Sequence, residues 1–137
     1  MKVDIYITTR WHGNFANGSG EYGIVLQVMQ NGKPRTKEHY AGWSHLPYQK
    51  LAVRAVTDAM QCMTSPCDVV IHTENPYVEG IISSGKTGGK YVELWESFFD
   101  AAKKMTSVKV VREKRHEYAS YIKQELARGE FITIEDR

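Results

Sequence analysis

The segment His72-Thr73-Glu74-Asn75-Pro76 places a carboxylate directly after the apolar run from Val69 to Ile71, which is typical of a buried strand. Asn75 is a favoured N-cap and Pro76 suits the first position of a helix, so a helix should begin there. Glu74 is therefore expected where a strand ends, the usual place for chemistry in open α/β sheets. Glu74 either takes part in chemistry there or is simply stabilised near the positive end of the following helix.

A second stretch matches a nucleotide-binding motif in its letters. Residues Gly80 to Thr87 follow the Gly-x-x-x-x-Gly-Lys-Thr pattern of phosphate loops. Such a loop requires a buried strand before it and a helix that begins at its Lys-Thr pair. Here a short helix is expected before it, and Gly88-Gly89 opposes a helix after it. We therefore interpret this stretch as a flexible loop.

Length and composition limit the class of protein. At 137 residues the chain suits one domain, and its formal charge of +2 neither demands nor excludes a nucleic-acid partner. The first residues are too polar for a signal peptide and no apolar run is long enough to span a membrane, so we expect a soluble cytoplasmic protein with no membrane partner. Cys62 and Cys67 lack a second cysteine pair, which argues against a zinc site and predicts reduced thiols.

The spacing of apolar residues predicts three strands followed by alternating helices and strands. Period-two alternation favours strands over residues 3 to 8, 22 to 29 and 35 to 42, with Asn31-Gly32 as a tight hairpin turn. The later elements are helices over residues 51 to 63, from 75, 92 to 102 and 116 to 127, and strands over 68 to 73 and 108 to 111.

These elements predict a single domain over residues 1 to 137. It is an α/β fold with a mixed sheet, three antiparallel strands and then parallel strands, flanked by helices in the order βββαβαβα. Residues 129 to 137 form a C-terminal tail or an extra strand, because residues 131 to 134 alternate like a strand.

This order and several short strings resemble the type 1 ribonuclease H family. The stretch from Thr73 to Val78 is similar to the family's Thr-Asp-Ser-x-Tyr-Val. The other similar strings are Val3 to Thr8, Gly20 to Gly23, Tyr91 to Trp95 and Gln124 to Ala127. Together they extend along almost the whole chain.

The family uses a cluster of carboxylates that holds two divalent metal ions for phosphodiester hydrolysis. The resemblance places its four acidic positions and its histidine at Thr8, Lys50, Glu74, Gln124 and His116. Glu74 and His116 are then remnants of the catalytic positions, and Thr8, Lys50 and Gln124 are substitutions that leave one carboxylate. We expect Lys50 to lie close to Glu74, where its charge replaces a metal ion. Compensation by Asp4, Glu117 or Glu125 is an open alternative.

The resemblance also suggests a phosphate-binding surface on the same face. Its candidate residues are Lys50, Lys86, Lys90, Arg112, Lys114 and Arg115. Trp11 or Trp43 is available for stacking on bases. The alternative is that these cations are solvated charges on helix ends and loops.

Two functions follow from this resemblance. The first is a ribonuclease H-like domain with a degenerate metal site, a non-catalytic module that binds nucleic acid (duplex or RNA/DNA hybrid) or a protein partner and needs no cofactor. The alternative is an active metal-dependent ribonuclease H or related phosphodiesterase with substituted ligands, which would require Mg²⁺ or Mn²⁺.

Overall fold

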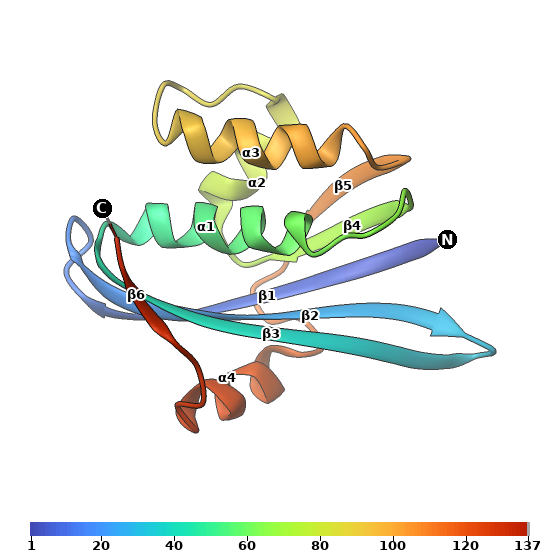
Figure 1. Cartoon of the computed structure of the whole chain (residues 1–137), viewed down its shortest axis with the longest axis horizontal. Coiled ribbons are helices and arrows are strands. Elements are labelled where there is room, and N and C mark those ends of the chain that lie inside the picture. The colour runs from blue at the N-terminus through green and yellow to red at the C-terminus, as the bar shows by residue number, and fades with distance from the viewer. Residues whose placement is uncertain (137) are drawn as a thin grey trace.

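The computed structural model describes residues 1–136, and its centre is a six-stranded sheet with helices on both faces (Figure 1). The strand order is β5-β4-β1-β2-β3-β6, with β1, β2 and β3 antiparallel and the other neighbours parallel. The strands are β1 (Lys2–Gly13), β2 (Gly18–Gln30), β3 (Lys33–Leu46), β4 (Asp68–Thr73), β5 (Ser107–Arg112) and β6 (Thr133–Glu135). The predicted mixed α/β sheet is confirmed.

Four helices cover the sheet unequally. They are α1 (Tyr48–Gln61), α2 (Pro76–Ser84), α3 (Val92–Ala102) and α4 (Ala119–Ala127). Helix α1 lies on one face with α3 stacked beyond it, whereas α4 lies alone on the other face (Figure 1). Within residues 1–136, no helix has both the length and the apolar character needed to cross a membrane.

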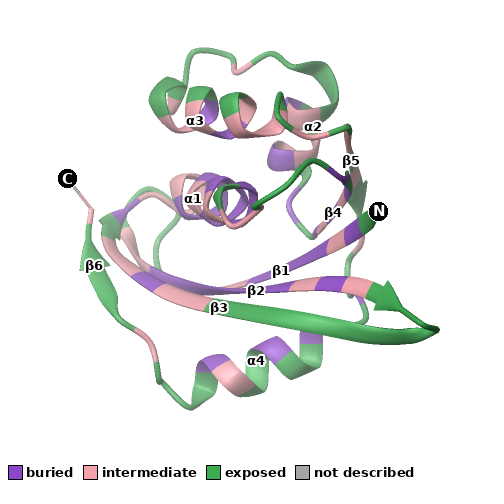
Figure 2. Ribbon diagram, turned by 45° about the vertical axis from the view of Figure 1, so that its right-hand side comes forward, coloured by how far each residue is buried: buried purple, intermediate pink, exposed green. Residues whose placement is uncertain are grey.

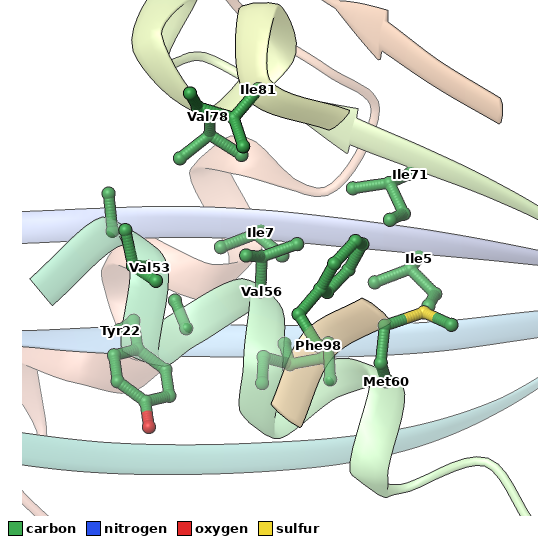
Figure 3. Close-up of a cluster of buried hydrophobic side chains, with 14 of the residues drawn as sticks. Ile5, Ile7, Tyr22, Val53, Val56, Met60, Ile71, Val78, Ile81 and Phe98 are labelled. Carbon is green, nitrogen blue, oxygen red and sulfur yellow. The ribbon is translucent and has the colours of Figure 1, made fainter. Parts of the chain in front are cut away.

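Strand β1 separates two cores because its side chains alternate between the two faces. Ile5 and Ile7 belong to the main core under α1 and α3, where Phe98 is also fully buried (Figure 3). Tyr6 belongs to the smaller core under α4, with Ile122. Burial is concentrated in α1, β1 and β2, and the first half of β3 is exposed (Figure 2).

Gly23 explains how closely α4 approaches the sheet. A Cβ atom at this position would lie 2.4 Å from Cγ2 of Ile122 and 2.6 Å from Cε1 of Tyr40. Neither neighbour could remain in place against such an atom, because packed interiors have no spare volume. Gly23 is therefore required for α4 to pack this closely against the sheet.

Several boundaries differ from those predicted. The β1–β2 hairpin continues to the pair Gly13 and Gly18, beyond the strands predicted over residues 3 to 8 and 22 to 29. Helix α2 continues to Ser84, and Gly85, whose φ is 73°, caps it. The stretch from Gly80 to Thr87 is therefore not a phosphate loop, as predicted, but its first part is helical and the prediction of a flexible loop is wrong there.

The C-terminal segment forms the extra strand, β6, and is held by buried charges. Asp136 is 5% exposed at its side chain, and its carboxylate accepts hydrogen bonds from Lys50 at 2.6 Å and from Nε of Arg54 at 3.0 Å. The guanidinium of Arg54 also lies 3.8 Å from the ring centroid of Trp43. Burial alone would raise the pKa of Asp136, but these two cations outweigh burial and lower it.

We expect Asp136→Asn to lower the free energy of unfolding at pH 7 by about 1.5–3 kcal/mol, the range for a hydrogen bond to a charged group. Because the folded-state pKa is lowered, the contribution of Asp136 is complete above the unfolded pKa of about 4 and is lost as the pH falls through the folded value. Urea denaturation at pH 7 and pH 3 checks this. The exposed pair of Asp100 and Lys103 supplies the control, since Asp100→Asn should change stability little.

Candidate functional site

Glu74 lies where β1 and β4 run side by side, immediately after Thr73, the last residue of β4, and before α2. Tyr6 pairs with His72 in this parallel register, so two residues further Thr8 lies beside Glu74. The Thr8 hydroxyl donates a hydrogen bond of 3.0 Å to Oε1 of Glu74. Asn75 caps α2 by accepting from the Val78 N–H at 3.0 Å, as predicted.

His116 completes this group from the connection between β5 and α4. Its Nε2 atom lies 2.8 Å from the Thr8 hydroxyl and 2.9 Å from the carbonyl oxygen of Ile7. Its Nδ1 atom accepts from the backbone N–H of Tyr118 at 3.2 Å. These contacts are all satisfied by a neutral ring with its proton on Nε2, while the Thr8 hydroxyl donates its own hydrogen bond to Glu74.

The electrostatics of His116 agree with a neutral ring. Its side chain is fully buried, and this burial lowers its pKa despite the hydrogen bond to Ile7 and the charge of Glu74, whose Oε1 lies 3.9 Å away. Both ring nitrogens are occupied within the protein. His116 therefore holds Thr8 and the approach to α4 in place and has no free nitrogen for a substrate.

Lys50 does not lie where the sequence placed it. Its ammonium group binds Asp136, and among residues 1–136 no ion pair joins it to Glu74. The prediction that Lys50 replaces a metal ion at Glu74 is therefore wrong. Successive residues of a helix point about 100° apart, so an alignment that is wrong by one residue assigns a side chain to a different face of α1.

Gln49, the residue before Lys50, is the one that faces the end of β4. Its Oε1 atom accepts a hydrogen bond of 3.0 Å from the side-chain amide of Asn75, next to Glu74. Gln49 therefore lies beside the residue that follows Glu74, and its amide adds no charge there. The sequence did not single out Gln49, although apolar residues Leu51, Ala52, Ala55 and Val56 fix which face of α1 is buried.

The remaining acidic candidates are occupied elsewhere. Asp4 lies 2.8 Å from Nε2 of His72, Glu117 accepts from the Tyr6 hydroxyl at 2.9 Å, and Glu125 pairs with Arg128 at 3.3 Å. Gln124 is exposed on α4, and among residues 1–136 no hydrogen bond joins it to Glu74 or Thr8. None of these residues adds a carboxylate to Glu74 in this arrangement.

This donor set does not fit a two-metal centre. Around Glu74 the structure offers one carboxylate, one hydroxyl, an amide pair and a histidine with no free nitrogen. Within residues 1–136 no three His, Cys, Asp or Glu side chains are grouped so that they could hold a metal ion. Hard divalent cations require several anionic oxygens, so no metal-dependent step is derived from these residues.

A second polar cluster lies beside the first on the α4 face. His72 stacks on Tyr6 with 4.3 Å between ring centroids, and its Nε2 and Nδ1 atoms lie 2.8 Å from Asp4 and 3.1 Å from Glu113. The cluster ties β1 and β4 to the connection that carries His116. The sequence indicates this cluster only through His72, which lies two residues before Glu74 and therefore on the same side of the strand.

The predicted basic residues divide into two groups. Lys86 and Lys90 lie on the loop between α2 and α3, and Arg112, Lys114 and Arg115 lie at the end of β5 and on the connection to α4. All five are exposed, and among residues 1–136 none forms an ion pair. Lys50 is 22% exposed and bound to Asp136, so it does not belong to such a surface.

Known proteins are similar to this chain in sequence and in fold. A protein named Ribonuclease H from Janthinobacterium sp. (strain Marseille) is 32% identical over 114 residues, which cover 74% of each chain. The structure of RNase H1 from Halobacterium salinarum NRC-1 superposes with a TM-score of 0.74 at 14% identity, over 93% of this chain and 99% of that one. The structure of the foamy viral protease-reverse transcriptase in complex with dsDNA superposes with a TM-score of 0.67 at 16% identity, over 89% of this chain and 87% of that one. No protein-family model matches the chain.

We expect His116 to make folding less favourable in acid. Because its folded-state pKa is lowered, stability is complete above the unfolded pKa of about 6.5 and falls as the pH drops below that value. Urea denaturation between pH 7.5 and pH 5.5 should show a smaller loss of stability for His116→Gln than for the wild type. His45→Gln, at an exposed histidine, is the matched control and should retain the wild-type dependence.

Proposed function

The chain belongs to the ribonuclease H family, and from this premise we propose that it is a nucleic-acid-binding domain whose metal site is degenerate and which does not cleave its partner. The observation that carries the proposal is the closed network of Thr8, Glu74 and His116 at the strand ends. A hydroxyl that donates to Glu74 satisfies this carboxylate without a cation.

The chemistry of the family explains why one carboxylate is insufficient. Two divalent ions activate a water and stabilise the leaving oxygen, and they share several anionic ligands. Thr8 and Gln49 supply neutral oxygen atoms instead, and His116 is buried and fully bonded. The residues of this site are able to position a nucleic-acid backbone. Nothing in their arrangement activates a nucleophile.

Exposed cations support a nucleic-acid partner. Lys86, Lys90 and Arg115 are free to contact phosphates because no carboxylate within residues 1–136 binds them. The similarity in fold to a reverse transcriptase solved with dsDNA motivates the same choice of partner. A protein partner and a cytoplasmic location are consistent with this proposal, and neither is required by it.

The names of the relatives favour a second candidate, an active metal-dependent ribonuclease H in which Glu74 is the surviving ligand. Glu74 is 34% exposed at its side chain, so it is accessible to an ion from solvent. The two candidates differ in whether Mg²⁺ or Mn²⁺ binds the protein.

Cleavage of an RNA/DNA hybrid should be undetectable with Mg²⁺ or Mn²⁺, and calorimetric titration should show no binding of either ion at millimolar concentration. Both results follow from the shortage of anionic ligands. Cleavage by the unaltered protein that Glu74→Gln abolishes would establish the active candidate instead.

The structure also predicts how metal binding can be introduced. Thr8→Asp combined with Gln49→Glu should place three carboxylates near one another and produce measurable Mn²⁺ binding. Adding Glu74→Gln to this double variant should remove the binding again. If the double variant folds and still binds no Mn²⁺, the assignment of Gln49 to the site is wrong.

Binding to nucleic acid should weaken steeply with salt, with a log-log slope of roughly −0.9 for each phosphate neutralised on B-form DNA. Lys86→Glu with Lys90→Glu should reduce affinity for different sequences by similar factors, as lost phosphate contacts do. Lys103→Glu with Lys104→Glu, on exposed positions after α3, changes the charge equally and serves as the control. No measurable binding at low salt would exclude a nucleic-acid-binding function.

A further inference from the structure

The end of the β1–β2 hairpin lies beyond the carboxyl end of β4, at the same end of the sheet as Glu74. Strand β1 runs parallel to β4 and continues past it to Gly13, and residues 14 to 17 make the turn (Figure 1). The backbone N–H of Tyr48, the first residue of α1, donates to the Phe15 carbonyl at 3.0 Å. This bond fixes the hairpin end against the start of α1.

One side of the hairpin end is aromatic. The ring of Tyr48 packs against Trp11 with 5.6 Å between centroids and against Phe15 with 5.9 Å. Phe15 is 64% exposed, so a large apolar ring is presented to solvent. Trp11 is half-buried against the main core and covers Gly20, where a Cβ atom would be 2.8 Å from its ring. Trp43, by contrast, is covered by Arg54 and is not available for stacking.

The turn itself is held in one shape by hydrogen bonds. The indole N–H of Trp11 donates to the Asn14 carbonyl at 3.1 Å. The side chain of Asn14 accepts from the backbone N–H groups of Ala16 at 3.0 Å and Asn17 at 2.9 Å. A turn that is already held in one conformation loses little conformational entropy when it binds a ligand.

The other side of β1 presents an anchored arginine, Arg10, beside His12. Arg10 and His12 both bind Glu21, whose side chain is 9% exposed, and His12 Nε2 lies 2.7 Å from its Oε1. Arg10 uses its Nε–H for this bond, and within residues 1–136 its two terminal nitrogens have no hydrogen-bond partner. Its side chain is 39% exposed, so these donors face solvent in a fixed orientation.

An exposed ring at the turn and an arginine with free terminal donors on the opposite side of β1 match the chemistry of an unpaired nucleic-acid strand that crosses the hairpin end. Bases of a single strand can stack on an aromatic ring while their phosphates accept from Arg, whereas a duplex keeps its base faces covered. We propose that the β1–β2 hairpin end, Arg10 to Gly18 with Tyr48, binds single-stranded nucleic acid by stacking a base on Phe15 and holding a phosphate at Arg10. This inference rests on the proposed function and names its partner more closely.

Fluorescence anisotropy with a labelled oligothymidylate and a labelled RNA/DNA hybrid tests this inference. The wild type should bind the single strand more tightly than the hybrid at equal salt. Phe15→Ala should weaken single-strand binding about tenfold and leave hybrid binding nearly unchanged. Ile132→Ala, which removes another exposed apolar side chain from the tail, is the matched control and should change neither.

Arg10 is tested without changing the net charge. The double variant Arg10→Gln with Glu21→Gln removes one charge of each sign and should reduce the salt slope on the single strand by about 0.7, the value for one phosphate contact. Glu125→Gln with Arg128→Gln is the equivalent change at an exposed pair on α4 and should leave the slope unaltered. Thermal unfolding of each variant checks that the fold is retained.

The outcomes separate the two proposals. Undiminished single-strand binding by folded Phe15→Ala, or a wild type that prefers the hybrid, overturns the role of the hairpin and leaves the proposed function standing. No binding of either probe overturns both.

Discussion

The parallel pairing of β1 with β4 is the constraint on which the rest of the site depends. It places Thr8 next to Glu74, and a hydroxyl is the group that this carboxylate can accept from at 3.0 Å without a counter-ion. Two carboxylates at such a distance repel each other unless cations or protons lie between them. A threonine at this position removes this repulsion, which supports our proposal that the site holds no metal ion.

The neighbouring residues are arranged around this pair in a consistent way. His116 donates to Thr8 and Ile7 from one side, and the stacked ring of His72 ties β1 to the connection that carries His116. Gln49 closes the other side through Asn75. Each polar group has a partner of the right kind, which is the condition for burying a network without a large cost in stability. The site is therefore built as a stable part of the fold and not as a strained one.

Much of the fold could be predicted because strands and helices have different periods. The alternation in β1 and the helical spacing in α1 assigned their buried faces correctly, and Asn75-Pro76 marked the start of α2. Glu74 was placed correctly for the same reason. These features depend on local sequence, where the physical rules are strongest.

Other features depend on contacts that the sequence does not encode locally. Lys50 was placed at Glu74 because a string match left its register on α1 uncertain by one residue, and one residue decides between Asp136 and the end of β4. The partner of Lys50 is Asp136, 86 residues later in the chain and directly after β6. The roles of His72 and His116 likewise depend on pairing between distant strands.

We propose that Glu74 is satisfied by Thr8 and needs no metal ion. The sharpest test is a crystal structure of the protein with Mn²⁺ and a bound oligonucleotide, with anomalous data collected for manganese. We expect no anomalous peak at Glu74 and an intact hydrogen bond between Thr8 and Glu74. A manganese peak coordinated by Glu74, with the Thr8 hydroxyl turned away, would overturn this proposal.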